Sequence, residues 1–329
     1  MNKSILVTGG AGYIGSHVCK ALADKGYRPI TFDNLSKGHE WAVQWGPLVK
    51  GDIHNTDVLM SAFQEYQPVS VMHFAASIEV GESVADPASY YYNNVSGSLN
   101  LVRCMLAAGI DKLVFSSTAA TYGIPQSKYI DETHPQQPIN PYGMSKLMVE
   151  RIITDCGHAN GLQHIFLRYF NACGADAENT IGESHSPESH LIPIIMQAAG
   201  GQRDKLFIFG DDYGTPDGTC LRDYIHVTDL ASAHILALEA LLNGAGSNVF
   251  NLGNGKGYSV LEILNAAEAV TGKKIPREIH DRREGDPPIL VASSEKAKKT
   301  LGWKPKKNLE DILSSAWRWH CKQNGITQQ

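Results

Sequence analysis

The stretch Thr8-Gly9-Gly10-Ala11-Gly12-Tyr13-Ile14-Gly15 decides the fold, because it follows an apolar, strand-like run and opens a helical pattern. Its glycines at intervals of three keep side chains away from a turn between a strand and a helix. Backbone N–H groups and the helix N-terminus at such a turn can bind the diphosphate of a dinucleotide. A P-loop is excluded, since no Gly-Lys-Ser/Thr follows. An isolated glycine triplet is equally compatible with a turn that binds nothing, so the surrounding sequence must decide.

Short β-rich apolar runs alternate with helical patterns through the first half of the chain, which is typical of a parallel sheet with right-handed crossovers. The expected strands are 5–7, 29–32, 48–49, 69–74, 113–115 and 165–169. The expected helices are 15–25, 56–66, 88–108 and 141–158. The predicted fold class is therefore α/β: a Rossmann-type, doubly wound parallel sheet followed by a smaller, mixed α/β C-terminal domain.

A polar, loop-like stretch at 175–187 marks the expected boundary between two lobes. We expect residues 1–175 to form the dinucleotide-binding domain and 176–329 to form a substrate-binding domain. One segment, about 223–253, breaks this division, because an amphipathic helix pattern at 228–242 leads into a strand-like run. That helix is expected to begin at a Thr-Asp cap, and the segment is expected to return to the first sheet. A capping box at 259–262 predicts a further helix.

Polar residues after the second, third and fourth strands predict how the nucleotide is held. Asp33 and Asn34 end the second strand, where a carboxylate accepts hydrogen bonds from ribose hydroxyls and repels a 2′-phosphate. NAD is therefore favoured over NADP, although Arg28 and Lys37 keep the alternative open. The two following strands end at further candidate cofactor residues, which are Asp52, Ile53, Phe74 and Ala75.

Tyr142-Gly143-Met144-Ser145-Lys146 is a YxxxK motif on an expected helix, where side chains four residues apart share one face. An ammonium beside a phenol favours the phenolate, whereas burial opposes it. A phenolate that acts near neutrality needs a pKa about 3 units lower than that of free tyrosine, or about 4 kcal/mol. Lys146 and the positive ring of NAD⁺ are the two cations that can supply this. From the motif alone, a surface Tyr–Lys pair is the better interpretation, since the chain has 13 tyrosines.

The composition excludes several classes of protein. The chain has 29 basic and 34 acidic side chains without a long basic run, so neither a nucleic acid nor an anionic membrane is an expected partner. Six cysteines without a CxxC pair favour reduced thiols in the cytosol. The first strand begins directly after the N-terminus and no stretch is apolar enough to span a bilayer, so we expect a cytoplasmic protein.

The segment 115–123, Phe-Ser-Ser-Thr-Ala-Ala-Thr-Tyr-Gly, leaves the fifth strand ahead of the YxxxK motif and supplies hydroxyl groups there. With the GxxGxxG glycines, it makes the chain resemble the UDP-hexose 4-epimerases of the extended short-chain dehydrogenase/reductase family over nearly its whole length. By this resemblance Thr118, Tyr142 and Lys146 form the catalytic triad. The implied reaction transfers the 4-hydroxyl proton to Tyr142 and a hydride from carbon 4 to NAD⁺, which leaves a 4-keto sugar.

The same resemblance assigns further residues to the two ligands. Asn94, Ser116 and Phe170 are expected at the cofactor, although core packing is a serious alternative for Phe170. Arg222 and Arg283 are expected at the diphosphate of a UDP-sugar, because a guanidinium fork suits phosphate oxygens. The other expected substrate residues are Asn171 at the diphosphate, Phe209 near uracil, Asp286 at the uridine ribose, and Leu191 and Tyr224.

Two positions depart from the family pattern. His190 stands where many members carry asparagine, and Leu290 stands at the position that sets the space for the 2-substituent of the sugar. Leucine there is intermediate, so turnover of N-acetylated sugars stays open. No metal site is expected, because His185 and His190 lack a carboxylate or cysteine arrangement with convincing ligand spacing.

Three rival functions remain to be weighed, and a homodimer is expected by resemblance alone. A 4,6-dehydratase of the same family needs an Asp-Glu pair after the catalytic threonine, where this chain has Ala119-Ala120. A decarboxylase needs a uronic acid substrate. A non-catalytic NAD(P)-sensing protein could keep the same fold, but the intact triad speaks against it.

Overall fold

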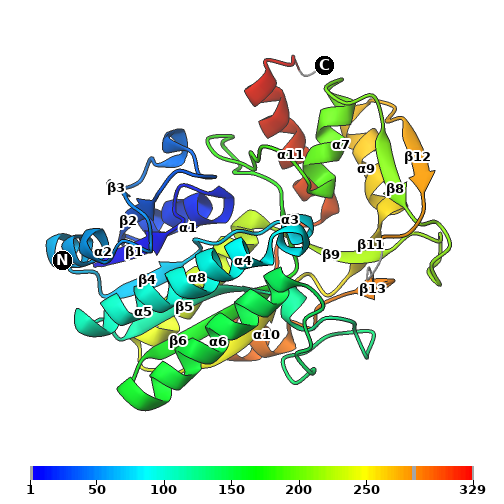
Figure 1. The fold of residues 1–329 in the computed structure, drawn as a ribbon. Helices are drawn as coiled ribbons and strands as arrows, with labels where there is room; N and C mark the ends of the chain where they lie inside the picture. The colour runs from blue at the N-terminus through cyan, green and yellow to red at the C-terminus, as the bar shows by residue number, and fades with distance from the viewer. Residues whose placement is uncertain (1–2, 284–286, 328–329) are drawn as a thin grey trace.

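The computed structural model describes residues 3–283 and 287–327 and contains a seven-stranded, entirely parallel sheet (Figure 1). The strand order is β10-β6-β5-β4-β1-β2-β3. The strands are β1 (Ser4–Thr8), β2 (Arg28–Asp33), β3 (Leu48–Lys50), β4 (Ser70–His73), β5 (Lys112–Thr118), β6 (Gln163–Tyr169) and β10 (Asn248–Leu252). The order reverses between β1 and β4, so a crevice opens at the carboxyl ends of these strands. The predicted Rossmann-type fold is confirmed.

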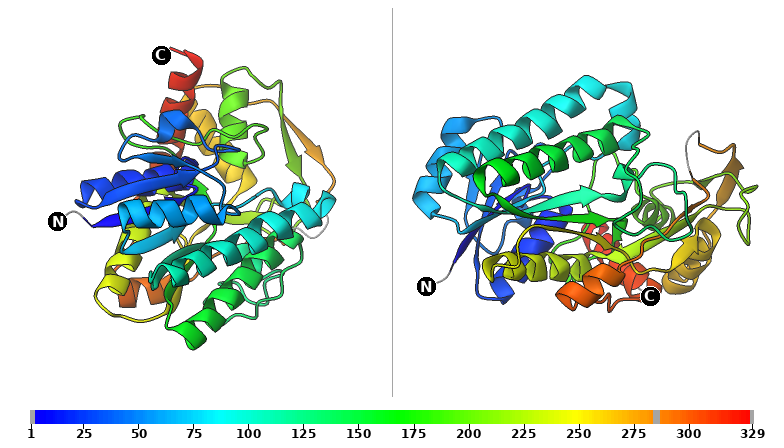
Figure 2. Two further views of the ribbon diagram at one scale, coloured as in Figure 1. Left: turned by 60° about the vertical axis from the view of Figure 1, so that its left-hand side comes forward. Right: turned by 90° about the horizontal axis from the view of Figure 1, so that it is seen from below.

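Helices cover both faces of this sheet, as the view from below shows best (Figure 2). The helices of the first domain are α1 (Tyr13–Asp24), α2 (Thr56–Tyr66), α5 (Gly97–Ala107), α6 (Pro141–Asn160), α8 (Val227–Leu242) and α10 (Glu295–Leu301). Helices α1, α8 and α10 share a buried apolar cluster with one face. Helices α2, α5 and α6 pack on the other face. Such two-sided burial explains why the central strands read as continuous apolar runs.

The predicted helix at 88–108 is present without a break, but one of its turns is π-helical. It consists of α4 (Pro87–Tyr90), a π-helical turn (Tyr91–Ser96) and α5. The π turn holds Asn94 in the interior, where its amide oxygen accepts from the backbone N–H of Ser77 at 2.8 Å and its Nδ2 donates to Ser145 Oγ at 3.0 Å. A wide turn of this kind often marks a functional position in a helix. Apolar periodicity predicts that this stretch is helical, but it does not indicate where the backbone hydrogen bonds change locally from the α to the π pattern.

The second lobe has its own small sheets and core. Strand β9 (Leu221–His226) pairs with β7 (Asn171–Cys173) and β13 (Ile289–Leu290) in parallel and with β11 (Gly257–Ser259) antiparallel. Strands β8 (Leu206–Phe209) and β12 (Arg277–His280) form a parallel pair. Helices α7 (Leu191–Ala199), α9 (Val260–Thr271) and α11 (Leu309–Asn324) pack against this lobe's apolar core (Figure 1). The predicted capping box of α9 is present, with Ser259 and Glu262 bonding reciprocally.

The chain returns from the second lobe to the first sheet through α8 and β10. Residues 223–226 still belong to β9 in the second lobe, and β10 is the edge strand beside β6. The expected Thr-Asp cap of α8 is wrong, since α8 begins after His226, whose ring nitrogen Nδ1 accepts from the backbone N–H of Thr228 at 3.1 Å. The numbered domain limits stay a prediction. Within residues 3–283 and 287–327, no helix combines the length and apolarity needed to cross a bilayer.

Candidate active site

A cleft of about 1560 Å³ opens at the carboxyl ends of the parallel strands and extends under the second lobe. It brings together most of the residues that the sequence predicted. From the cofactor set, the lining includes Gly9, Gly12, Tyr13, Ile14, Gly15, Asp33, Asn34, Asp52, Ile53, Phe74, Ala75, Ser116, Tyr142, Lys146 and Phe170. From the substrate set, it includes Thr118, Asn171, His190, Leu191, Phe209, Arg222, Tyr224, Arg283 and Leu290. Asn94 lies behind the wall in the interior, and Asp286 lies outside the described residues.

The glycine turn of the cleft has no space for side chains. Gly9 has a φ of +72°, and a Cβ there would lie 2.6 Å from the backbone nitrogen of Ala75. A Cβ on Gly15 would lie 2.2 Å from the carbonyl oxygen of Gly9. Gly12 caps the N-terminus of α1 with no side-chain hydrogen bond. The turn therefore presents bare backbone and a helix N-terminus to the cleft, as diphosphate binding requires.

Asp33 and Asp52 fix the loops beside this turn. Asp33 accepts hydrogen bonds from the backbone N–H groups of Ala11 at 3.0 Å and Leu35 at 2.8 Å. Burial raises the pKa of Asp33, and these two bonds oppose the shift. Partial burial opposes ionisation of Asp52 as well, but hydrogen bonds from His54 and Asn34 outweigh it and lower the pKa of Asp52. Both carboxylates line the cleft.

Two basic residues, Arg28 and Lys37, left NADP possible as the cofactor, and only one of them faces the cleft. Lys37 lines it, next to Ser36 and Gly38. Arg28 lies at the opposite end of β2, where its guanidinium stands 5.5 Å from the ring centroid of Tyr66. Because Arg28 begins the strand that Asp33 ends, it points to the edge of the sheet away from the crevice.

The predicted triad converges on the cleft from two elements. Thr118 ends β5, and its hydroxyl accepts from the backbone N–H of Ala120 at 3.2 Å. Tyr142 and Lys146 lie on α6, which begins at Asn140, whose side chain accepts from the N–H of Gly143 at 2.8 Å. Lys146 donates to the carbonyl oxygen of Ser116 at 3.0 Å.

Burial sets the protonation of the two titrating members of the triad. Desolvation lowers the pKa of the Lys146 ammonium to about 7, against the opposing charge of Glu150. Desolvation raises the pKa of the Tyr142 phenol, against a hydrogen bond with Thr118. Both shifts favour the neutral forms, so the protein alone does not make the phenolate. A further positive charge in the cleft is needed to do that.

A buried ion pair behind the triad was missed by the sequence analysis. The Glu150 carboxylate accepts hydrogen bonds from Arg168 Nε at 2.9 Å, from Arg168 Nη2 at 2.5 Å and from Ser117 Oγ at 2.5 Å. Arg168 also donates to the hydroxyl of Tyr122 at 3.0 Å. Glu150 lies four residues after Lys146 on the same face of α6, so the helical spacing that indicated the YxxxK pair could also have indicated this carboxylate.

The expected substrate residues form the opposite wall, where they contact one another or nearby backbone carbonyls. The guanidinium of Arg283 lies 4.0 Å from the ring centroid of Phe209. Arg222 donates to the carbonyl oxygen of Leu221 at 2.7 Å, and Asn171 Nδ2 donates to that of Asp223 at 2.8 Å. Phe170 lines the cleft and also packs in a small apolar cluster, which Leu290 joins from one side. Its two predicted roles, at the cofactor and in packing, are compatible in this position.

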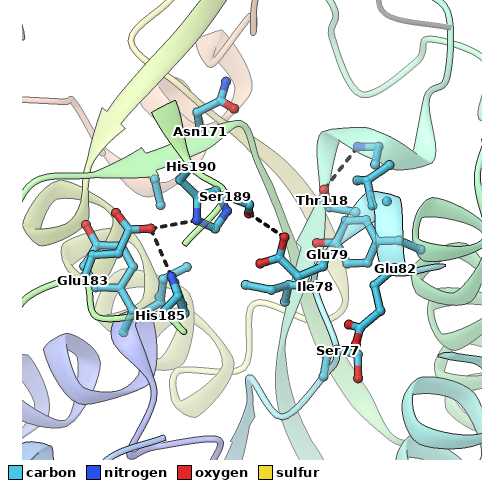
Figure 3. Close-up of a pocket in the computed structure, with 18 of the residues that line it drawn as sticks. Ser77, Ile78, Glu79, Glu82, Thr118, Asn171, Glu183, His185, Ser189 and His190 are labelled. Carbon is cyan, nitrogen blue, oxygen red and sulfur yellow. Dashed lines mark hydrogen bonds and ion pairs between the residues drawn. The ribbon is translucent and has the colours of Figure 1, made fainter. Parts of the chain in front are cut away.

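Four side chains meet on the wall of the cleft near His190: Glu183, His185, Glu188 and His190, here called the EHEH cluster. Figure 3 shows His185 and His190 both turned toward the carboxylate of Glu183. Burial opposes protonation of the imidazoles, but the two carboxylates outweigh it and raise the pKa of His185 to about 9 and that of His190 to about 11. No metal ligands are expected here from the spacing of His185 and His190 alone. The missed signal is a doubled Glu-Ser-His, at 183–185 and 188–190.

The sheet, the bare glycine turn and the triad define a dinucleotide-dependent α/β enzyme of the oxidoreductase type. The sequence model of the NAD dependent epimerase/dehydratase family matches residues 5–253. The chain belongs to this family, and the predicted resemblance is confirmed.

Relatives and solved structures are similar over nearly the whole chain. A UDP-glucose 4-epimerase of Rhizobium leguminosarum bv. trifolii is 53% identical over 322 residues, with 98% of each chain covered. The structure of UDP-glucose 4-epimerase from Brucella ovis in complex with NAD is 49% identical, with a TM-score of 0.94 and 97% and 98% of the two chains covered. The UDP-Glc/GlcNAc 4-epimerase of Campylobacter jejuni is 43% identical, with a TM-score of 0.86 and 98% and 100% covered.

Proposed function

We propose that this chain inverts carbon 4 of UDP-hexoses with NAD, interconverting UDP-glucose and UDP-galactose through a 4-keto sugar. One observation carries the proposal: Thr118, Tyr142 and Lys146 open into the same cleft as the bare glycine turn. The names of the similar proteins, UDP-glucose 4-epimerases among them, support the choice of substrate.

The residues present fit NAD. Gly9 and Gly15 form a cradle that any Cβ would fill, and Asp33 stands at the end of β2 to accept from ribose hydroxyls. When bound, NAD supplies the redox chemistry, taking a hydride from carbon 4 and returning it. Phe74 and Asp52 are proposed to line the adenosine end, and Phe170 the nicotinamide end.

The triad moves the proton. Tyr142 is proposed to remove the proton from the sugar 4-hydroxyl, while Thr118 hydrogen-bonds the same oxygen and holds it in place. Because burial raises the pKa of Tyr142, this step requires the positive charges of Lys146 and of the bound cofactor. The ionised form of Tyr142, which can accept the proton, is therefore populated near neutral pH only when the cofactor is present.

The second lobe is proposed to hold the UDP while the hexose turns. Inversion requires the ketone to present its other face to the same reactive ring, so the sugar must rotate and the nucleotide must stay bound. Arg222 and Arg283 are proposed to bind the diphosphate, and Phe209 to stack on uracil. Arg283 covers one face of the Phe209 ring, so a base that stacks on that same face would displace the guanidinium.

The dehydratase alternative is disfavoured by two side chains of the cleft. Ala119 and Ala120 both line it directly after Thr118, where a dehydratase needs an acid and a base to eliminate water. Neither methyl group transfers a proton. The proposed homodimer and the proposed cytoplasmic location rest on resemblance and composition.

Incubation of the purified protein with UDP-galactose, without added NAD, tests the proposal. UDP-glucose should form, and Tyr142→Phe should abolish its formation while Tyr129→Phe, at an exposed position outside the cleft, should not. Release of a 4-keto-6-deoxy sugar, or of carbon dioxide from UDP-glucuronate, would overturn the assignment. Bound NAD without any turnover would indicate a sensing protein instead. A parallel incubation with UDP-N-acetylgalactosamine tests whether Leu290 admits a 2-acetamido group.

A further inference from the structure

The EHEH cluster gathers two imidazoles and two carboxylates around one point. The ligand atoms of Glu183, His185, Glu188 and His190 all lie within 4.8 Å of one another. Both carboxylates are almost fully buried, with side-chain exposures of 6% for Glu183 and 4% for Glu188. Burying two carboxylates is costly unless a positive charge compensates them.

The contacts within the cluster are short, but they are not directed as hydrogen bonds. His190 Nδ1 lies 2.9 Å from Glu183 Oε1 and 3.3 Å from Glu188 Oε1. His185 Nδ1 lies 3.4 Å from Glu183 Oε1 and 3.6 Å from Glu188 Oε2. Nevertheless both Nδ1 atoms are buried and have no hydrogen-bond partner of acceptable geometry among the described residues. Both imidazole nitrogens therefore lie close to the carboxylates, nearest to the same Glu183 oxygen, without a hydrogen bond to satisfy them.

These imidazole–carboxylate distances lie near the edge length of a coordination tetrahedron, with Glu183 contacted through Oε1 and Glu188 through both oxygens. Zinc binds imidazole nitrogen and carboxylate oxygen at about 2.0–2.2 Å, and ligands around a tetrahedral ion at that radius lie about 3.3–3.5 Å apart. The four imidazole–carboxylate distances, 2.9–3.6 Å, bracket this value. Two carboxylates balance the charge of a divalent cation, and imidazole with carboxylate is a donor set suited to Zn²⁺.

We propose that the EHEH cluster is a binding site for one divalent transition-metal cation, with Zn²⁺ as the best fit. Four protein ligands leave no open position for a substrate, so the ion has a structural role and takes no part in the hydride or proton transfer. The inference goes beyond the proposed function and does not depend on it.

The place of the cluster in the fold defines what the ion stabilises. The loop 183–190 joins the two lobes: His39 donates to the carbonyl oxygen of Ser184 at 2.8 Å, and Trp319 donates to that of Glu183 at 2.8 Å. The hydroxyl of Ser189 donates to Glu79, which stands across the cleft (Figure 3). His185 also packs edge-on against Tyr13 of the glycine turn, with 6.4 Å between ring centroids. An ion at the cluster fixes this loop against the cofactor half of the cleft.

Metal content of the full-length chain tests the proposal. After chelation and dialysis, the protein is incubated with excess ZnCl₂, passed through a desalting column and analysed for zinc. We expect about one Zn²⁺ per chain, and at least about tenfold weaker Zn²⁺ binding for His185→Gln. The matched control His158→Gln, at an exposed helix position outside the cluster, should bind like the unaltered chain.

Two further measurements keep the test independent of folding and of enzyme activity. Co²⁺ in place of Zn²⁺ should give the intense visible absorption of a tetrahedral site, and Glu188→Gln should abolish it. Zn²⁺ should raise the midpoint of thermal unfolding for the unaltered chain and not for either cluster variant. Five of the six cysteines are buried, so thiols do not offer a competing exposed site. Zinc bound far below one per chain, or equally by His185→Gln, would show that the cluster is an ion-pair network alone and would overturn the proposal.

Discussion

Replacing Glu150 by glutamine should destabilise the protein far more than a change of one charge on the surface would. Glu150 and Arg168 are paired through two hydrogen bonds of 2.9 and 2.5 Å, and their side chains are 4% and 6% exposed. Glutamine keeps the volume but leaves the guanidinium buried without a counter-charge. Removing one partner of a buried pair costs roughly 3–5 kcal/mol. For 329 residues this corresponds to a fall of roughly 4–7 °C in the midpoint of thermal unfolding.

The second variant separates loss of the pair from loss of volume. Arg168→Met in the Glu150→Gln background removes the uncompensated charge, so it should recover part of the lost stability. Urea unfolding followed by circular dichroism measures Glu150→Gln, Arg168→Met and the double variant. If Glu150→Gln cost less than about 1 kcal/mol, or if the two changes were simply additive, the pair would not be the buried, coupled unit that its geometry implies.

Three further changes test the glycine turn, the uracil wall and the buried histidines. Gly15→Ala should weaken NAD retention at least about tenfold, because the new Cβ would lie 2.2 Å from a carbonyl oxygen. The control Gly214→Ala has open space around the new methyl group. Chromatography of the bound nucleotide should show that it retains as much NAD as the unaltered chain. Phe209→Leu should weaken UDP binding by about 1 kcal/mol in calorimetry, and unchanged affinity would exclude the ring as the uracil platform. Burial lowers the pKa of His234 to about 4, below its value near 6.5 in the unfolded chain. Between these two pH values only the unfolded chain binds a proton at this residue. The free energy of unfolding therefore falls as the pH falls from about 6.5 to about 4. At pH 5 the buried, neutral His234 lowers the free energy of unfolding by roughly 2 kcal/mol. His234→Gln should reduce the number of protons bound on unfolding by about one, measured as the slope of the free energy of urea unfolding against pH. An unchanged slope would show that His234 is already protonated in the folded protein.

The sequence predicted the first sheet well because its signals are local. Each strand from β1 to β6 lies on a predicted apolar run, and the helix of the YxxxK motif begins at the predicted Asn140-Pro141. The π turn at 91–96 escaped prediction, since apolar periodicity indicates a helix but not its local hydrogen-bond pattern.

The residues of the candidate site could be predicted where they belong to one short motif. They were harder to predict where the fold brings together residues from distant parts of the sequence. The triad and the glycine turn are local patterns. Arg168 joins Glu150 from a strand 18 residues away, and no spacing rule announces such a pairing. The carboxylates of the EHEH cluster do not follow from the spacing of the histidines alone; their signal is the doubled Glu-Ser-His.

The return of β10 to the edge of the first sheet means that the chain passes between the lobes more than once. It leaves after β6, builds part of the second lobe, comes back through α8 to β10, and then leaves again for β11. Several segments of the chain therefore connect the two lobes. A wide opening of the cleft would have to change the backbone conformation of all of these segments at once. We therefore expect the two lobes to stay nearly fixed relative to each other during turnover. The large motion is then the rotation of the hexose inside the cleft.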